Sequence, residues 1–343
     1  MNLINFINLI NLINFTNLPR RAKNVLALFA LVAAGGCIHQ DPDGEGVDPT
    51  LVRVTMEVAF DDDLLPVTAA NAARAAAEPP YRFIVEARRE GKVAHRQVIV
   101  LPADSVPAGK FTLPVAIPLH ALDYTLAAWV DRAADDNGND LHHDATDLQL
   151  VACTEPYTGN TPYRDCYRGT APLDLGEYRE RWNATAAVSI PLERPLAAYR
   201  LVATDAAKFI EDTRQQRDAG QTYTLTVKYG FYFPLGCNAI TGEPGLSTMN
   251  VTFTAPLLVT DDGSGECTVA ADYIFAGAGE SYMPLSIEIR DADGKGISRT
   301  TGINVTYKRG QVTTLRGRFL TGRFDTGVGI DPDFEEGDIE VEI

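Results

Sequence analysis

Four oxygen-bearing side chains in one acidic run are the residues of this sequence best suited to hold a ligand. Asp135, Asn137, Asn139 and Asp140 follow one another at the short spacing with which a calcium loop begins. Counted from Asp135, the run lacks the Gly expected at the sixth position and the Glu expected at the twelfth, where Thr146 stands. We therefore favour a solvated loop and keep calcium as the alternative at these four residues.

Familiar catalytic patterns are not matched in the chain. The run from Gly245 to Met249 begins like a nucleophile elbow but lacks its final Gly, and neither a His-Glu-x-x-His helix nor a Gly-rich phosphate loop occurs. His142 and His143 could hold a transition metal, but neighbouring residues of an extended segment point in opposite directions. Two of the abundant acids could still meet in a cleft, as in glycosidases. We expect a protein that is not an enzyme, with no catalytic residues and no cofactor.

Cys37 is the cysteine whose chemical role the sequence indicates most clearly. A basic patch from Arg20 to Lys23 precedes an apolar run from Val25 to Ala34, which continues into Gly-Gly-Cys37 and then turns polar. This is the arrangement of a secretory signal, and the run is too short for a transmembrane helix of about 20 apolar residues. Small residues before a cysteine resemble the bacterial lipobox, so we expect Cys37 to be the lipidated first residue of the mature chain. An ordinary cleaved signal with an unlipidated cysteine is the alternative.

On this interpretation the chain before residue 50 has two functional parts. Residues 1–36 form the signal, within which residues 1–18 repeat an Asn/apolar pattern found nowhere else and indicate a misplaced start. Residues 37–49 form a lipidated tether. Its acids, Asp41, Asp43 and Glu45, resemble the signal that sends Bacteroidetes lipoproteins to the outer face of the outer membrane, and a simple flexible tether is an equally open interpretation.

Four further cysteines remain in the exported part of the chain. An even number of cysteines in an exported protein allows three pairings, and the sequence cannot choose among them. We expect Cys153 to pair with Cys166 and Cys237 with Cys267, each pair within one expected domain. A zinc site is disfavoured, because none of the four has CxxC spacing and export favours oxidation.

The charge of the chain excludes one class of partner. The formal net charge is -16 at pH 7, and loss of the basic residues of the signal makes the mature chain more negative still. Such a chain repels nucleic-acid phosphates, and no basic stripe offsets this locally. With 45% hydrophobic and 22% charged residues the composition is that of a globular protein. We therefore expect no nucleic-acid binding.

From Leu51 onward the hydrophobic residues recur mainly with a period of two, which is typical of half-buried strands. The runs Val52–Phe60 and Tyr81–Ala87 show it most clearly. Further expected strands are Gln97–Leu101, Phe111–Ile117, Tyr124–Val130, Leu148–Ala152, Ala184–Ile190, Ala198–Ala203, Thr222–Phe233, Met249–Thr254, Thr268–Phe275, Pro284–Arg290, Gly302–Tyr307 and Val312–Leu320. Many short strands separated by turns predict an all-β protein made of sandwiches.

Two segments depart from this pattern. Asp61–Ala77 predicts a loop or short helix, and Thr204–Gly220 predicts a helix with an N-cap at Thr204 or Asp205. The segment from Pro191 to Pro195, bracketed by two prolines, is the best candidate for a domain boundary. We expect an N-terminal sandwich over residues 50–193 and a C-terminal sandwich over residues 194–343, with the short helix in the second.

Several stretches share features with one group of proteins. They are Tyr124-Thr-Leu-Ala-Ala-Trp129-Val-Asp131, Tyr163-Arg-Asp165-Cys-Tyr-Arg-Gly169, Leu192-Glu-Arg194-Pro195, Asp272-Tyr-Ile-Phe275 and Arg318-Phe-Leu-Thr-Gly322. Together they resemble the FimB/Mfa2-type fimbrial anchor and accessory lipoproteins of Bacteroidetes, and a related Bacteroidetes domain family of unknown function. One departure is that the group commonly has Asp-Ala-Phe-Tyr-Gly where this chain has Asp165-Cys-Tyr-Arg-Gly169.

The resemblance implies two tandem transthyretin-like or immunoglobulin-like β-sandwiches on a lipid anchor at the outer membrane. It also implies a role in fimbrial assembly, anchoring or adhesion, with fimbrial subunits as partners that receive a donated strand. The terminal segment Asp338–Ile343 alternates, so Ile339, Val341 and Ile343 could occupy one face of such a strand. Pairing of this segment within its own domain is the alternative, and we favour it.

Glycan binding at the cell surface is the main alternative function. Trp182 lies in a charged stretch beside Tyr178, and an exposed aromatic pair of this kind suits a sugar platform. Trp129 lies in an alternating strand and is expected in the core. Exposure of Trp182 and Tyr178 would favour glycan contact, whereas burial of the pair would favour a scaffolding role.

Overall fold

The computed structural model describes residues 51–60, 78–106, 111–181, 184–214, 221–260, 263–322 and 339–342. Strands dominate these residues, and one short α-helix accompanies them. The prediction of an all-β protein built from sandwiches is therefore confirmed. Cys37 and the predicted signal and tether, residues 1–49, lie outside the described residues.

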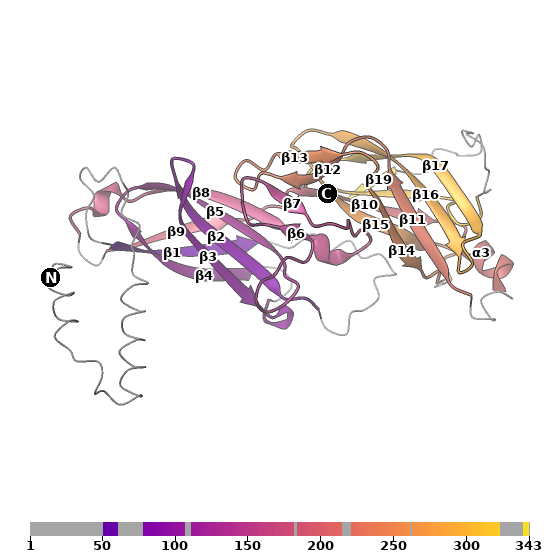
Figure 1. Cartoon of the computed structure of the whole chain (residues 1–343), viewed down its shortest axis with the longest axis horizontal. Helices are drawn as coiled ribbons and strands as arrows, with labels where there is room; N and C mark the ends of the chain where they lie inside the picture. The colour runs from indigo at the N-terminus through magenta and orange to yellow at the C-terminus, as the bar shows by residue number, and fades with distance from the viewer. Residues whose placement is uncertain are drawn as a thin grey trace, which may run out of the picture. The chain divides into compact units, whose positions relative to one another are not determined.

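Two sheets that face each other across a core form the first sandwich (Figure 1). Its strands are β1 (Leu51–Phe60), β2 (Tyr81–Arg89), β3 (Lys92–Leu101), β4 (Phe111–His120), β5 (Asp123–Arg132), β8 (Tyr167–Asp174) and β9 (Thr185–Pro191). One sheet has the order β4-β1-β9, with β1 antiparallel to β4 and parallel to β9. The other has the order β3-β2-β5-β8 and is antiparallel throughout. Single 3-10 turns occur at Ala103–Ser105, Pro162–Arg164 and Gly176–Tyr178.

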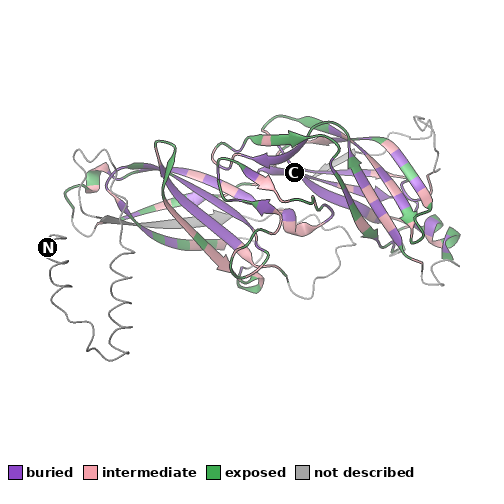
Figure 2. Ribbon diagram, in the orientation of Figure 1, coloured by how far each residue is buried: buried purple, intermediate pink, exposed green. Residues whose placement is uncertain are grey.

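The core of this sandwich follows from the alternating pattern. In β4, Val115, Ile117 and Leu119 are buried while the residues between them are exposed. In β2 the whole central stretch is buried: Phe83 belongs to the sandwich core, whereas Ile84 belongs to a second cluster on the opposite face. β2 is therefore covered on both faces, as Figure 2 shows by its continuous purple colour.

The second sandwich has the same construction. Its strands are β10 (Leu196–Ala203), β11 (Tyr223–Tyr229), β14 (Thr252–Leu257), β15 (Cys267–Phe275), β16 (Ser281–Asp291), β17 (Gly296–Tyr307), β18 (Val312–Gly317) and β19 (Ile339–Glu342). One sheet has the order β15-β10-β18-β19, with β10 antiparallel to β15 and parallel to β18, and the other has the order β14-β11-β16-β17. The helix α3 (Ala206–Asp212) buries Ala206 and Phe209 in the core between these sheets.

Strand order and direction repeat between the two sandwiches. β1 and β10 each open a sandwich, and each lies between an antiparallel and a parallel neighbour. The second sheets match strand by strand, β3-β2-β5-β8 against β14-β11-β16-β17. The sequence shows no repeat between its halves, so the duplication is visible only in the topology.

A further sheet is built from insertions into both sandwiches. Its order is β13-β12-β7-β6, with β6 (His143–Asp144) and β7 (Val151–Cys153) inserted between β5 and β8, and with β12 (Phe233–Cys237) and β13 (Pro244–Thr248) inserted between β11 and β14. β7 and β12 pair antiparallel, which joins the two sandwiches by main-chain hydrogen bonds. A buried cluster that includes Trp129, Leu148, Leu196 and Phe275 lies at this junction.

Buried polar contacts reinforce the junction. Arg164, from the segment before β8, donates to the carboxylate of Asp272 in β15 at 2.7 Å, and both side chains are almost fully buried. Tyr157 donates to the same carboxylate at 2.7 Å. The amide oxygen of Asn160 accepts from the backbone N–H of Ala271 at 3.0 Å. The segment between β7 and β8 therefore binds to the second sandwich, although it directly precedes β8, a strand of the first sandwich.

Two sequence expectations are corrected by the fold. The expected helix Thr204–Gly220 corresponds to α3, which ends at Asp212, and residues 215–220 lie outside the described residues. Asp205 is at the N-cap position, as expected, but its carboxylate accepts from the backbone N–H groups of Leu320 and Thr321 instead of capping the helix. The single strand expected over Thr222–Phe233 is two strands, β11 and β12, which belong to different sheets.

Candidate functional site

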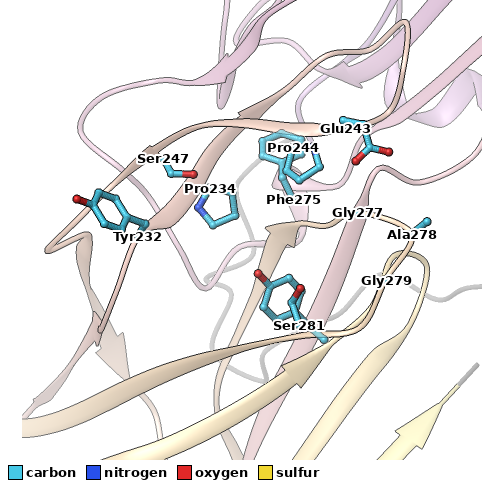
Figure 3. Close-up of a pocket in the computed structure, with 11 residues that line it drawn as sticks. Tyr232, Pro234, Glu243, Pro244, Ser247, Phe275, Gly277, Ala278, Gly279 and Ser281 are labelled. Carbon is cyan, nitrogen blue, oxygen red and sulfur yellow. The ribbon is translucent and has the colours of Figure 1, made fainter.

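The described residues form a pocket of about 420 Å³ beside the β12–β13 hairpin, which we call the hairpin pocket (Figure 3). Its apolar wall includes Tyr232, Pro234 and Phe275, and its polar groups include Glu243 and Ser281. The segment 277–279 closes another side with small residues only, so backbone is exposed there. A volume of this size falls in the range of about 300–1,000 Å³ typical of small-molecule sites.

Three exposed aromatic side chains lie on the segments next to the pocket, and one of them, Tyr232, lines it. Phe231, Tyr232 and Tyr282, which we call the aromatic rim, are 61%, 63% and 63% exposed. The rings of Phe231 and Tyr282 lie 6.4 Å apart with their planes at 74°. Leu246 and Met249 on the same hairpin segment are also exposed. Apolar groups gathered on a surface in this way mark interaction sites more often than scattered single residues do.

Buried neighbours force the rim outward. Tyr229 and Phe233 are both buried, with ring centroids 4.1 Å apart, so the three residues between them must leave the core. Gly230 holds this turn in place by donating its N–H to the carbonyl of Pro284 at 2.7 Å. The exposure of Phe231 and Tyr232 is thus a consequence of the two anchors on either side.

Close backbone packing seats the hairpin on the inserted sheet. A Cβ on Gly236 of β12 would lie 2.4 Å from the carbonyl oxygen of Val151, so only glycine allows β12 to approach β7 this closely. On the outer strand, Leu246 has φ +48°, in the left-handed region that a non-glycine residue seldom adopts. Such strain is often found beside binding sites.

One arginine ties the two sides of the pocket together. Arg309 donates to the carbonyl of Ala276 at 2.9 Å and also to that of Gly242. Its guanidinium lies 3.7 Å from the carboxylate of Glu243, whose side chain is 64% exposed and keeps acceptor capacity towards solvent. Burial raises the pKa of Tyr307, another lining residue, so its hydroxyl stays protonated at neutral pH.

A second feature of interest is the terminal strand. β19 pairs antiparallel with β18 and with no other strand of the described residues, so it lies at the edge of its sheet. Ile339 and Val341 are in this strand, opposite Leu315 and Thr313, whereas Ile343 lies outside the described residues. The segment pairs within its own sandwich here, and its donation to a partner stays a prediction.

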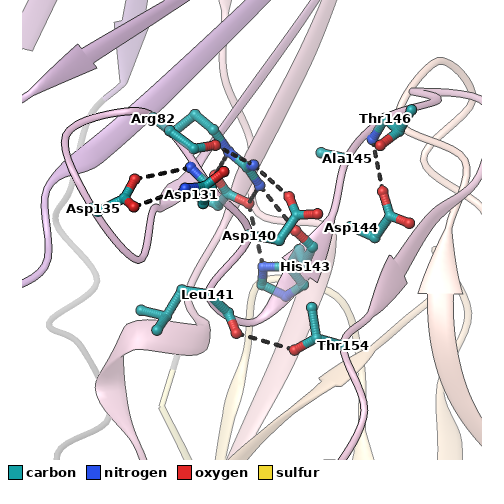
Figure 4. Close-up of polar contacts among 12 residues, drawn as sticks. Arg82, Asp131, Asp135, Asp140, Leu141, His143, Asp144, Ala145, Thr146 and Thr154 are labelled. Atoms are coloured by element: carbon teal, nitrogen blue, oxygen red, sulfur yellow. Dashed lines mark hydrogen bonds and ion pairs between the residues drawn. The ribbon is translucent and has the colours of Figure 1, made fainter.

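The acidic loop does not gather its oxygens around a common point (Figure 4). The Asp135 carboxylate accepts from the backbone N–H of Asn137 at 2.9 Å and from the side-chain amide of Asn139 at 2.7 Å. Asp140 instead forms an ion pair with Arg82, which is buried and also binds Asp131. Within the described residues no group of His, Cys, Asp and Glu could hold a metal ion. Calcium binding by this loop stays a prediction, and Arg82 is the partner that the structure shows for Asp140.

The expected glycan platform of Trp182 and Tyr178 stays a prediction. Tyr178 is half-buried against the core of the first sandwich, and the guanidinium of Arg181 lies 5.5 Å from its ring centre. Trp182 lies outside the described residues. Trp129 is fully buried at the junction, against His143. The exposed aromatic groups are those of the hairpin, which the sequence analysis did not single out.

The four described cysteines are free thiols. Cys237 belongs to the junction cluster together with Phe275, whereas Cys267 begins the same strand that Phe275 ends, about 26 Å away at the usual rise per residue. A disulfide needs Cα atoms about 4.4–6.8 Å apart, and the expected pair of Cys237 and Cys267 is not bonded here and stays a prediction. The pair of Cys153 and Cys166 is not bonded here and stays a prediction.

The stretches that suggested a family resemblance contribute several residues to the junction, and Phe275, at the end of one of them, also lines the pocket. Arg194 binds the Asp165 carboxylate through two nitrogens, at 2.9 and 2.7 Å, and donates to the Tyr167 hydroxyl at 2.8 Å. Arg164 and Asp272, described above, come from two more of these stretches. These residues therefore have a structural role, and they do not point to a ligand.

The hairpin residues could have been found from one signal. Phe231, Tyr232 and Phe233 are three consecutive aromatic residues after Gly230, and a strand with a period of two cannot bury three neighbours on one face. The run was assigned to one strand because its flanks alternate well. Glu243, Ser281 and Tyr307 carry no such signal, since only the fold brings them together.

Several proteins of known structure are similar to this chain at low identity. A candidate cell adhesion protein from Bacteroides ovatus is 14% identical with a TM-score of 0.44, over 78% of this chain and 92% of that chain. The fimbrial anchor protein Mfa2 from Porphyromonas gingivalis is 12% identical with a TM-score of 0.37, over 77% and 90%. A fimbrial assembly protein from Parabacteroides distasonis is 9% identical with a TM-score of 0.40, over 85% and 99%. No curated protein matches the chain.

The family assignment rests on the sequence profile described as "Family of unknown function (DUF6562)", which matches residues 48–342. This span includes both sandwiches and the inserted sheet. The relation to a family of unknown function that the sequence suggested is thereby confirmed. The chain belongs to DUF6562, a family whose function is not known.

Proposed function

We propose that this protein is an outer-membrane lipoprotein that works without catalysis in fimbrial assembly, anchoring or adhesion, by donating a β-strand to a partner subunit. The observation that carries the proposal is the position of β19 at a sheet edge, where it is held by β18 alone among the described strands. A terminal strand with one neighbour can be exchanged without dismantling the rest of the sandwich.

The chemistry of β18 explains why a strand is required beside it. Val312, Thr313, Thr314 and Leu315 are all buried, so the outward N–H and C=O groups of this strand need hydrogen-bond partners. Either β19 or an equivalent strand from another chain can satisfy them, because main-chain pairing does not depend on side-chain identity. The same property lets β19 pair with a sheet edge of a fimbrial subunit.

Membrane attachment is the second part of the proposal. Cys37 carries the lipid, and residues 37–49 link it to the first sandwich at the outer face of the outer membrane. Among the described residues, no helix is long and apolar enough to cross a membrane. The proposal that the protein works without catalysis rests on the sequence, which matches none of the familiar catalytic patterns considered above.

Co-purification from native membranes in mild detergent, with mass spectrometry of the partners, tests both parts. Val341→Pro removes a backbone donor in the middle of β19 and should abolish recovery of fimbrial subunits, whereas Val341→Thr keeps the donor and should retain it. Cys37→Ala should release the protein from the membrane.

Two outcomes would overturn the strand proposal. One is that the wild-type protein recovers no fimbrial subunit, and the other is that Val341→Pro recovers as much as Val341→Thr. An unmodified Cys37 peptide in membrane-bound protein would overturn the lipid anchor.

A further inference from the structure

We propose that the hairpin pocket binds a neutral carbohydrate, with Tyr232 of the aromatic rim contacting a sugar ring. This inference is independent of strand donation, because the pocket lies at the β12–β13 hairpin and not along β18 or β19. It also relocates the glycan site expected from the sequence, from Trp182 and Tyr178 to residues of the second sandwich.

The lining of the pocket combines apolar and polar groups, which matches the faces and the edge of a sugar ring. A pyranose ring presents C–H groups on its faces and hydroxyl groups around its edge. Tyr232 and Pro244 supply apolar surface for the former, and the hydroxyl groups of Ser247 and Ser281 and the carboxylate of Glu243 supply hydrogen-bond partners for the latter. Figure 3 shows the Tyr232 ring and the Glu243 carboxylate on either side of the apolar wall.

Charge selects a neutral ligand over an anionic one. No lysine or arginine lines the pocket. The nearest cation, Arg309, is already engaged by the carbonyl groups of Ala276 and Gly242 and lies 3.7 Å from both Glu193 and Glu243. A sialylated or phosphorylated ligand would therefore meet the Glu243 carboxylate without a free cation to offset it.

The backbone of β13 disfavours a peptide as the occupant. An added peptide strand would have to pair with the open edge of β13, which is the outer strand of its sheet. Pro244 has no N–H to donate, and Leu246 has a left-handed backbone, so the run of free hydrogen-bonding groups along this edge is interrupted. The mostly exposed strand, green in Figure 2, is thus not a ready template for an extended chain.

The sandwich itself does not need this hairpin. In the first sandwich the equivalent strands β2 and β3 are joined by a tight turn at Glu90 and Gly91, both with positive φ. The second sandwich instead inserts the segment that carries Phe231, Tyr232 and Met249, all exposed to water. Exposing large apolar side chains brings no stability to a sandwich that a tight turn could close, which favours a binding role for them.

A glycan array that carries neutral and sialylated oligosaccharides, probed with the detergent-solubilised full chain, tests the proposal. Neutral glycans that bind are then titrated by calorimetry against the wild type, Tyr232→Ala and Glu243→Gln. We expect both substitutions to weaken binding about tenfold or more, since each removes a direct contact. Leu258→Ala is the matched control, because Leu258 is 56% exposed but does not line the pocket, and its affinity should equal that of the wild type.

Each other outcome overturns the proposal. These outcomes are that no glycan on the array binds, that only sialylated glycans bind, or that Tyr232→Ala and Glu243→Gln bind as tightly as Leu258→Ala. Urea unfolding of each variant checks that the fold is kept, and Tyr232 is exposed enough for its removal to be tolerated. Because Val341→Pro leaves the pocket intact, failure of strand donation and failure of glycan binding are distinguishable.

Discussion

Replacement of Asp272 by asparagine should destabilise the protein more than any surface substitution. The Asp272 carboxylate accepts from Arg164 at 2.7 Å, from the hydroxyls of Tyr157 and Tyr229 at 2.7 and 2.6 Å, and from the backbone N–H of Tyr273 at 2.9 Å. All four partners are donors. The asparagine side chain keeps one acceptor oxygen, which can face Arg164 and the Tyr273 N–H, while its NH₂ group faces the two tyrosine hydroxyls and reverses the direction of their hydrogen bonds.

The expected loss of unfolding free energy follows from the burial of Arg164, whose guanidinium keeps its charge after the substitution. Arg164 is only 1% exposed, so Asp272→Asn leaves a guanidinium in the protein interior with no counter-charge. Breaking a buried pair in this way costs about 3–5 kcal/mol of unfolding free energy. This is a large share of the roughly 5–15 kcal/mol by which proteins are usually stable.

Urea unfolding of the wild type and the variant, followed by tyrosine fluorescence and far-UV circular dichroism, measures the loss. Lys208→Gln is the control, because the pair of Lys208 and Asp212 is exposed and its loss should not shift the midpoint resolvably. The double variant Arg164→Met/Asp272→Leu should be more stable than Asp272→Asn, since it removes both charges. A loss of less than about 1 kcal/mol for Asp272→Asn would refute the reasoning that a buried, ionised pair joins the sandwiches.

Three further predictions concern the same region. Gly159→Ala places a Cβ 2.3 Å from the ring of Phe253 and should cost about 1–3 kcal/mol in urea unfolding, so an unchanged midpoint would contradict the docking of this loop. Burial raises the pKa of Cys237 to about 12 and that of Cys166 well above its usual value, so both should react with a thiol reagent at pH 8 only after unfolding; rapid labelling of the native reduced chain would disagree. Burial lowers the pKa of His142 from 6.5 to about 3, so the unfolded chain binds more protons between these values and stability should fall with falling pH, by up to about 1.4 kcal/mol per pH unit. His142→Gln should flatten this slope in urea midpoints at pH 7, 6 and 5, and an equal slope would argue against burial of the imidazole.

Most individual strands were predictable from local pattern. The alternation in Phe111–Ile117 and Tyr124–Val130 corresponds to β4 and β5, because a strand with one buried face must repeat every two residues. The prediction failed at Thr222–Phe233, where Tyr229 and Phe233 are both buried but belong to different sheets. The break at Gly230 depends on a hydrogen bond to Pro284, a residue far along the chain.

The candidate site was less predictable than the fold. Trp182 and Tyr178 were preferred because they lie in a charged stretch, yet Tyr178 packs against a core. Tyr232 lies in an apolar run that predicts the interior of a strand. It is nevertheless exposed, because Tyr229 and Phe233 on either side of it are the residues that pack in the core. Exposure of an aromatic residue is set by its neighbours in space, and a linear pattern reports only its neighbours in sequence.

By itself, the sequence determined the acidic character of the chain and the all-β class, and it predicted the export signal with its Cys37, since each depends on composition or on spacing over a few residues. Tertiary structure alone decided the duplicated topology, the sheet shared by both insertions, and the junction of Arg164 and Asp272. These features join residues that are distant in the chain. Many sequences satisfy the same local pattern, and only the packing of the folded chain selects which distant residues meet.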